Sequence, residues 1–97
     1  MNDALKIDRN DNVAVVIRPV KSGEKLQYNN YENGNGYVTA LADIPIYHKV
    51  ALADIAKGEK VIKYGEHIGE ASESIKIGDY VHTHNVASVR EDLRDNL

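Results

Sequence analysis

Two histidines separated by one residue, His82 and His84, are the most chemically suggestive feature of the sequence. In an extended strand, residues i and i+2 point to the same face, so a strand here would set the two imidazoles side by side and turn Thr83 away. Imidazole nitrogen binds zinc or ferrous iron well, but two ligands do not complete a site. His48 is the first candidate for a third ligand or a general base. The alternative is an exposed histidine pair on a strand face and a turn histidine without chemistry.

The composition describes a single small domain. The 97 residues contain no Cys, Phe or Trp and carry a formal net charge of −3. A chain of this length forms one core, which must here be built from Val, Ile, Leu and Ala with some of the Tyr residues at its margin. The absence of Cys excludes disulfides, thiolate-bound metals and thiol nucleophiles. We therefore expect one domain over residues 1–97 with one hydrophobic core.

The distribution of charged and apolar residues narrows the class of partner. Lys and Arg are scattered among Asp and Glu instead of forming a basic stripe, which argues against nucleic acid. No window reaches the apolar length of a membrane span, and residues 1–6 do not begin a secretory signal. These features predict a cytoplasmic protein that binds neither nucleic acid nor membrane. Exposed edges of short strands would also favour a homo-oligomer.

Short apolar runs separated by glycine-containing turns predict an all-β fold. Residues 13–17, Val-Ala-Val-Val-Ile, form a continuous β-branched run and are expected to be the central strand, covered on both faces. Further strands are expected at 37–41, 49–52, 60–64 and 67–71. None of these runs has the sustained spacing of a long amphipathic helix.

Two segments depart from this pattern. Residues 27–36 are rich in Asn and Gly, which readily take positive φ, and are predicted to be a flexible loop or a hairpin tip. Such a loop would be a lid or, more simply, a solvated connection. Residues 87–97 are predicted to be a tail or a short helix at about 89–95, because apolar residues recur there at helical spacing and Ser88 with Glu91 forms a capping-box pattern.

One short motif occurs three times: an apolar residue, two further residues, Gly, an acid, one further residue and a second apolar residue. The copies span residues 20–26, 55–61 and 75–81. Glycine can supply a turn conformation that other residues resist, and the flanking apolar side chains can anchor both sides of the turn in the core. The spacing is too irregular for a solenoid. The motif therefore predicts one unit, a turn leading into a strand, used three times.

A longer ordered series of residues carries a family resemblance. The series is Asp43-Ile44-Pro45, His48-Lys49-Val50-Ala51-Leu52, Asp54-Ile55, Gly58-Glu59, Val61-Ile62-Lys63-Tyr64-Gly65, Ile68-Gly69, Gly78 and Val81-His82-Thr83-His84-Asn85. Over roughly residues 5–86 the chain resembles the N-terminal or small-subunit module of the altronate/galactarate dehydratase family, a SAF domain with a β-clip fold. Tyr47 departs from the family, which commonly has Gly at this position, and the segment 27–36 is longer than usual.

The resemblance implies a function and a partner. A lone module of this kind would be the small subunit of a sugar-acid hydro-lyase, which helps to bind substrate or metal and is completed by a separate large catalytic subunit. The isolated chain would then be inactive. A related sulfolactate lyase would have a small subunit of the same kind. The alternative from another class is a non-catalytic SAF module that binds carbohydrate or takes part in assembly.

The chemistry of dehydration suggests roles for individual residues. Removing water from a sugar acid requires a base for the proton beside the carboxylate, an acid for the leaving hydroxyl and positive charge at the intermediate. The resemblance implies Fe(II) or another divalent metal as the cofactor. We expect His82 and His84 to be metal or substrate ligands and His48 to be the third ligand or a catalytic general base. Lys63 and Asn85 are the expected substrate-binding residues. The simpler interpretation of Lys63 is a lysine on a solvated strand face.

Overall fold

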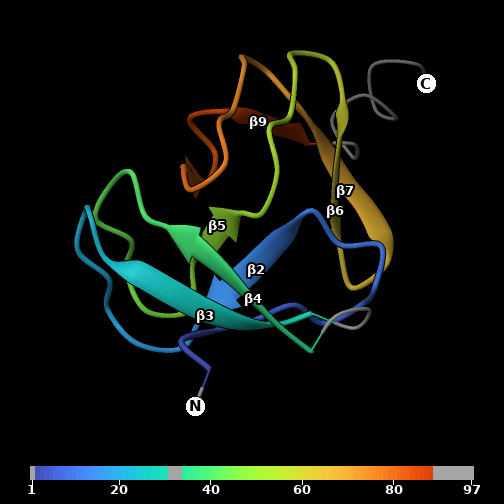
Figure 1. Cartoon of the computed structure of the whole chain (residues 1–97). Coiled ribbons are helices and arrows are strands. Elements are labelled where there is room, and N and C mark those ends of the chain that lie inside the picture. Colours follow the sequence, from blue (N-terminus) through green and yellow to red (C-terminus); the bar gives the residue numbers. More distant parts are fainter. Residues whose placement is uncertain (1, 31–33, 89–97) are drawn as a thin grey trace.

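The computed structural model describes residues 2–30 and 34–88, and this part of the chain forms two β-sheets without a helix (Figure 1). The sheets have the strand orders β4-β3-β1-β2-β5-β8 and β6-β7-β9. The strands are β1 (Ala4–Leu5), β2 (Val13–Val16), β3 (Lys25–Asn30), β4 (Gly34–Thr39), β5 (Lys49–Ala51), β6 (Lys60–Lys63), β7 (Glu66–Ala71), β8 (Tyr80–Val81) and β9 (Val86–Ser88). Neighbouring strands are antiparallel except β1 and β3, which are parallel. The all-β prediction is confirmed. None of the described segments is a helix with the length and hydropathy needed to span a bilayer.

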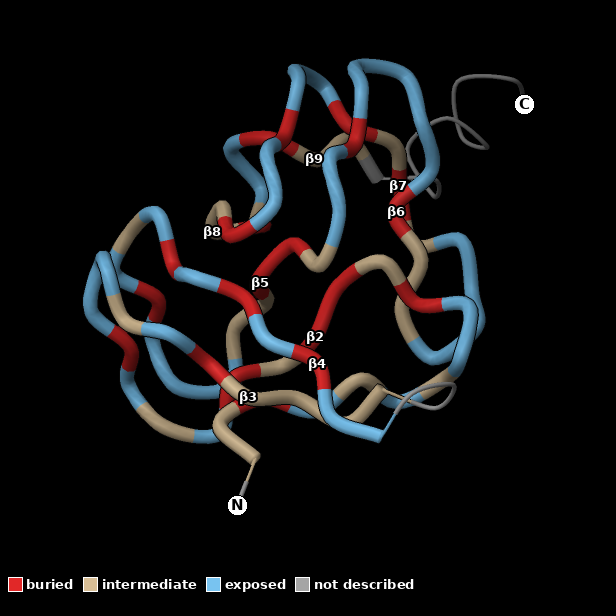
Figure 2. The backbone as a smooth tube through the Cα atoms, in the orientation of Figure 1, coloured by how far each residue is buried: buried red, intermediate tan, exposed pale blue. Residues whose placement is uncertain are grey.

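The hydrophobic interior consists of two clusters, so the prediction of one core was wrong. The first contains Ala4, Ala14, Val16, Val20, Leu26, Val38, Ala40, Ile44 and Val50. The second contains Val13, Ala51, Ile55, Val61, Ala71, Ile75 and Val81. Successive residues of a strand face opposite sides, so β2 contributes to both clusters, and it lies at the centre of the molecule with β5 (Figure 2). The predicted central strand is therefore covered on both faces, as expected.

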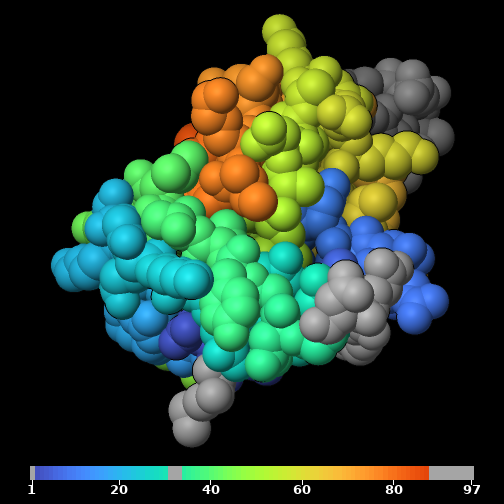
Figure 3. All heavy atoms as spheres, viewed as in Figure 1, coloured from blue at the N-terminus to red at the C-terminus, as the bar shows by residue number. Residues whose placement is uncertain are grey.

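Each copy of the repeated motif forms a turn that is bonded to a neighbouring strand in the same way. The glycine N–H donates to the carbonyl of a residue in a strand or directly after one, and the N–H of that residue donates back to the carbonyl of the acid. The three sets of glycine, acid and strand residue are Gly23, Glu24 and Ala40; Gly58, Glu59 and Ala71; and Gly78, Asp79 and Ala51. The copies at 55–61 and 75–81 face each other through a bridge between Ile55 and Ile75, as their colours show in Figure 3.

A fourth copy of the turn, residues 44–50, was not predicted. Tyr47 takes the place of glycine with φ of 68°, and its N–H donates to the carbonyl of Val16 at 2.8 Å. The N–H of Val16 donates back to the carbonyl of His48 at 2.9 Å, and Ile44 bridges to Val20 of the first copy. Sequence reasoning missed this copy because both its glycine and its acid are replaced.

Proline explains why a histidine can occupy the position of the acid. In the other three copies the carboxylate accepts a hydrogen bond from the backbone N–H three residues earlier. Pro45 is the residue three positions before His48, and proline has no N–H to satisfy. The side chain of His48 is therefore free for another use.

Most of the segment predicted as a flexible loop, residues 27–36, is paired strand. β3 and β4 form a hairpin in continuous register from Lys25 opposite Thr39 to Asn30 opposite Gly34. The ring of Tyr28 lies over its partner Gly36, where an added Cβ would stand 2.4 Å from the ring. The glycine thus makes room for a cross-strand aromatic ring, and the flexible-loop prediction was wrong for these strands.

The predicted C-terminal segment is only partly described. Residues 87 and 88, assigned to the start of a tail, belong to β9 and pair with β7. The possible helix at about 89–95 lies outside the described residues.

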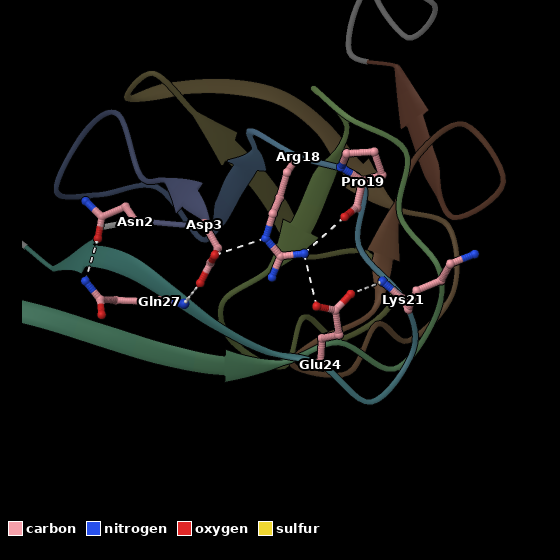
Figure 4. Close-up of polar contacts among 7 residues, drawn as sticks. All are labelled: Asn2, Asp3, Arg18, Pro19, Lys21, Glu24 and Gln27. Atoms are coloured by element: carbon pink, nitrogen blue, oxygen red, sulfur yellow. Dashed lines mark hydrogen bonds and ion pairs between the residues drawn. The ribbon is translucent and has the colours of Figure 1, made fainter.

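A polar network joins the N-terminal segment to the first half of the fold (Figure 4). The carboxylate of Asp3 accepts the N–H of Gln27 at 2.9 Å and pairs with Arg18 at 3.1 Å. Arg18 also pairs with Glu24 at 3.0 Å. The hydrogen bond from Gln27, followed by the contact with Arg18, lowers the pKa of Asp3. These partly exposed pairs contribute modestly to stability, but they fix the chain start beside β3.

Tyr47→Gly is expected to raise the free energy of unfolding by about 0.5–1 kcal/mol, measured by urea denaturation. A non-glycine residue at positive φ costs about 1–2 kcal/mol, and the greater freedom of glycine in the unfolded chain offsets about 0.4–1 kcal/mol of that gain. The side chain of Tyr47 is 70% exposed, so little packing is lost.

The matched change is Gly58→Ala, which should lower the free energy of unfolding. Gly58 has φ of 90°, and nothing lies within 4 Å of a Cβ added there, so only backbone conformation opposes the substitution. A loss of stability in Tyr47→Gly would instead show that the tyrosine ring holds the turn by packing.

Candidate functional site

Three histidines and Tyr80 form one ring cluster where β5 begins and β8 ends. The ring centre of His48 lies 4.9 Å from that of His82. The ring of Tyr80 lies 5.6 Å from both of these and 5.5 Å from the ring of His84. The antiparallel pairing of β5 with β8 explains the contact, because His48 precedes the first strand and His82 follows the second. Sheet pairing therefore brings together residues that are far apart in sequence.

The two neighbouring histidines do not lie on a strand, so this part of the prediction was wrong. β8 ends at Val81, and residues 83–85 form a turn in which the N–H of Asn85 donates to the carbonyl of His82 at 3.1 Å. His82 is half-buried and His84 is exposed. The ring of Tyr80 is stacked on His82 with an angle of 14° and is tilted by 56° against His84.

Asn85 is the residue that ends the strand. Its side chain is 3% exposed. Its Oδ1 accepts the N–H of His82 at 3.0 Å, and its Nδ2 donates to the carbonyl of Tyr80 at 2.9 Å. Buried polar groups are normally satisfied in this way. Asn85 therefore shapes the turn from inside the fold, and its predicted substrate-binding role stays a prediction.

The hydroxyl of Tyr80 is hydrogen-bonded to Nδ1 of His48 at 2.6 Å. A neutral imidazole carries one N–H and one acceptor nitrogen. When Tyr80 donates, Nε2 of His48 holds the proton; when Nδ1–H donates to the Tyr80 oxygen, Nε2 is free to act as a base. Sequence reasoning missed Tyr80, although its position two residues before His82 was a usable signal.

A hollow of about 210 Å³ lies beside the ring cluster, lined by Lys49, Ile68, His82, Thr83 and Val86. Ile68 and Val86 pack against the second hydrophobic cluster and form an apolar floor. An ammonium group, an imidazole and a hydroxyl line the remainder. Complete ligand pockets have volumes of about 300–1,000 Å³. The described residues therefore do not by themselves form a hollow of that size.

Positive charge dominates this hollow. Burial and, secondarily, the ammonium of Lys63 lower the pKa of Lys49. Burial, followed by the charges of His48, Lys49 and His84, lowers the pKa of His82 below its ordinary value of 6.5. In both cases the surroundings disfavour another positive charge. His82 is therefore less readily protonated than an ordinary histidine.

Lys63 and Tyr64 lie at the turn between β6 and β7. The Nζ atom of Lys63 is 4.7 Å from the centre of the Tyr64 ring, a cation–π contact. The buried carboxylate of Asp11 accepts the N–H groups of Tyr64 and Gly65 at 3.0 and 2.7 Å and holds the turn in place. The predicted substrate-binding role of Lys63 stays a prediction.

The described residues do not contain a ready metal site. In residues 2–30 and 34–88, no group of three or more His, Asp or Glu side chains is placed to hold a metal ion. Nδ1 of His48 is already engaged by Tyr80. These side chains alone therefore do not fit the predicted divalent metal, which would need ligands from elsewhere.

Known proteins are similar to this chain along most of its length. Residues 2–89 match the family described as altronate/galactarate dehydratase SAF domain. The chain is 42% identical over 89 residues to an altronate dehydratase of Escherichia coli and 33% identical over 94 residues to one of Bacillus subtilis. These matches cover 92% and 97% of this chain but only 17% and 18% of the relatives. A (2R)-sulfolactate sulfo-lyase subunit alpha of Chromohalobacter salexigens is 39% identical over 85 residues, which are 86% of this chain and 90% of that subunit.

Lys49→Met is expected to raise the pKa of His82 toward 6.5, measured by NMR titration of its ring protons. The substitution removes one neighbouring positive charge, while burial and the other two imidazoles remain. Because the folded pKa is lowered, the unfolded chain binds more protons near pH 6. Folding stability should therefore decrease as the pH falls from above 6.5 through the lowered pKa, and the decrease should be smaller in the variant.

Lys57→Met is the matched control, because Lys57 is an exposed lysine in the turn at 55–61. It should leave the titration of His82 unchanged. The same curve in Lys49→Met as in the unmodified chain would show that Lys49 does not contribute to the lowered pKa of His82.

Proposed function

Because the chain belongs to the altronate/galactarate dehydratase SAF domain family, we propose that it forms part of a hydro-lyase acting on a sugar acid such as altronate or galactarate. The observation that carries the proposal is the hydrogen-bonded His48–Tyr80 pair beside a half-formed cationic hollow. Dehydration requires a group that can take up and release a proton next to a place for a carboxylate. The two features supply these requirements side by side.

His48 is the proposed catalytic residue. In the tautomer whose Nδ1–H donates to the Tyr80 oxygen, Nε2 takes the proton from the carbon beside the substrate carboxylate. The resulting imidazolium gives that proton to the hydroxyl on the next carbon, the carbon–oxygen bond breaks, and water leaves. The imidazole returns to its neutral form, so the proton balance closes within one residue. Tyr80 acts as a positioning residue that fixes the ring and the tautomer.

A larger catalytic partner completes the proposed site. The chain matches a segment of much larger dehydratases and most of a named subunit of a lyase. The small volume of the hollow supports the same conclusion, because one chain supplies too few walls to enclose a sugar acid. Ile46 and Tyr47, which precede His48, are exposed apolar side chains that such a partner would cover. The isolated chain is then inactive, and the predicted cytoplasmic location and small-subunit role belong to this proposal.

A second candidate function is the small subunit of a (2R)-sulfolactate lyase. The observation that favours it is the match to subunit alpha of such an enzyme over 90% of that subunit. Both reactions begin with a proton beside a carboxylate and differ in the group that leaves. The same His48–Tyr80 pair would serve either one.

His48→Gln is expected to lower kcat by about 10²–10⁴-fold, the usual contribution of a general acid or base. The measurement uses the chain co-expressed with its large catalytic chain, with altronate, galactarate and sulfolactate as alternative substrates. Activity is expected only in the mixture. His67→Gln, at an exposed position in β7, is the control and should leave kcat unchanged.

Two outcomes would contradict this proposal. Full activity of His48→Gln would remove the catalytic role. No turnover of any of the three substrates by the mixture would favour the non-catalytic SAF module that binds carbohydrate or takes part in assembly.

The proposed cofactor is Fe(II) or another divalent metal, held by His82 and His84 together with ligands from the partner. His82→Ala and His84→Ala should each weaken Fe(II) or Zn(II) binding to the assembled enzyme, as measured by equilibrium dialysis. Loss of a residue that only supports a metal ligand costs about 10–100-fold in affinity, so loss of a direct ligand should cost at least as much. His67→Ala is the control. Unchanged affinity in both variants would exclude a metal role for the pair.

A further inference from the structure

Lys49 is the lysine that lines the hollow in which the proposed reaction places the substrate carboxylate. It lies in β5 between Val15 of β2 and Val81 of β8. Residues directly opposite in antiparallel strands point to the same face, and Val81 belongs to the second hydrophobic cluster. The half-buried side chain of Lys49 therefore runs over the edge of this cluster and lines the hollow.

Within the described part of the chain, no carboxylate is paired with Lys49. The ion pairs there involve Arg18 and Lys21, which belong to the first half of the fold. The charged group that acts on Lys49 is another cation, Lys63. A partly buried ammonium without an anion is costly, because burial removes hydration that nothing replaces. An anion in the hollow would supply the missing partner.

We propose that the hollow is a subsite for the carboxylate of a small hydroxy acid. The ammonium of Lys49 binds the carboxylate, and the Thr83 hydroxyl and the His82 ring bond the neighbouring oxygens. Ile68 and Val86 pack against the carbon chain. This inference deepens the proposed function and rests on it for the identity of the acid.

The size of the hollow limits what it holds. A volume of about 210 Å³ corresponds to about seven water molecules at about 30 Å³ each. This is room for a carboxylate and the first carbons of an acid, with the rest of a sugar acid extending past His82 toward the His48–Tyr80 pair. His82 makes this path possible, because it lines the hollow and also contacts the ring of His48.

The experiment is an NMR titration of the full chain with sodium glycolate at constant ionic strength. Saturable shifts of the His82 and Thr83 amides are expected, with a millimolar Kd. Two control solutes should not reproduce these shifts. Ethylene glycol lacks the carboxylate, and the sulfate ion lacks the planar shape of a carboxylate. Lys49→Met should raise the glycolate Kd by at least about tenfold, because a charge-assisted hydrogen bond is lost. Lys49→Arg should retain binding, and Lys57→Met should leave the Kd unchanged.

Two outcomes would overturn the subsite. One is an unchanged glycolate Kd in a folded Lys49→Met chain. The other is that sulfate or ethylene glycol causes the same amide shifts as glycolate. Thr83→Val provides a second variant at an exposed turn position, where folding is not at risk. It should weaken glycolate binding by a few-fold, and if Lys49→Met does not fold, an unchanged Kd in Thr83→Val overturns the proposal.

Failure of the subsite can be separated from failure of the proposed function. If the chain does not bind glycolate but its mixture with the large chain dehydrates a sugar acid, the subsite alone is refuted. If glycolate binding depends on Lys49 but the mixture shows no turnover, the dehydratase proposal alone is refuted.

Discussion

Reciprocal backbone hydrogen bonds between each turn and a strand distant in sequence are the constraint on which this fold depends. A turn residue with positive φ donates to a strand carbonyl, and the N–H of the same strand residue donates back to the turn. A buried backbone group without a partner costs as much as a lost hydrogen bond, so the turn cannot shift without breaking both bonds. At Gly78 the approach is so close that an added Cβ would stand 2.1 Å from the carbonyl oxygen of Thr39. With neither Phe nor Trp in the chain, these backbone contacts set the register that large side chains set elsewhere.

The same constraint explains the position of His48. In three of the turns the residue after glycine is an acid whose side chain caps its own turn. In the fourth, Pro45 leaves no N–H to cap, so His48 keeps the backbone bond to Val16 and directs its ring to Tyr80. His48 therefore lies on a rigid part of the scaffold and not on a loose loop. Precise placement of a catalytic group requires such a position.

Local patterns predicted several of the strands, but they missed β3 and did not predict which strands pair. The β-branched run at 13–17 predicted the central strand, and the glycine motif predicted three of the four turns. The fourth turn was hidden because Tyr47 tolerates the φ that glycine usually supplies. The segment 27–36 has the composition of a loop, yet the contact of Tyr28 with Gly36 pairs most of it.

The candidate site shows the same limit of local patterns. The alternation that would align His82 with His84 requires the strand to continue, and Asn85 ends it by bonding the backbone at Tyr80 and His82. The meeting of His48 with His82 depends on the pairing of β5 with β8, which local sequence does not encode. His82 contacts the ring of His48 and also lines the hollow with Lys49, and it directly follows β8. β8 is the edge strand of its sheet. An edge strand leaves backbone groups and side chains open on one side. A site placed there needs a second surface to enclose it, so the strand order agrees with the proposal that a partner completes the site.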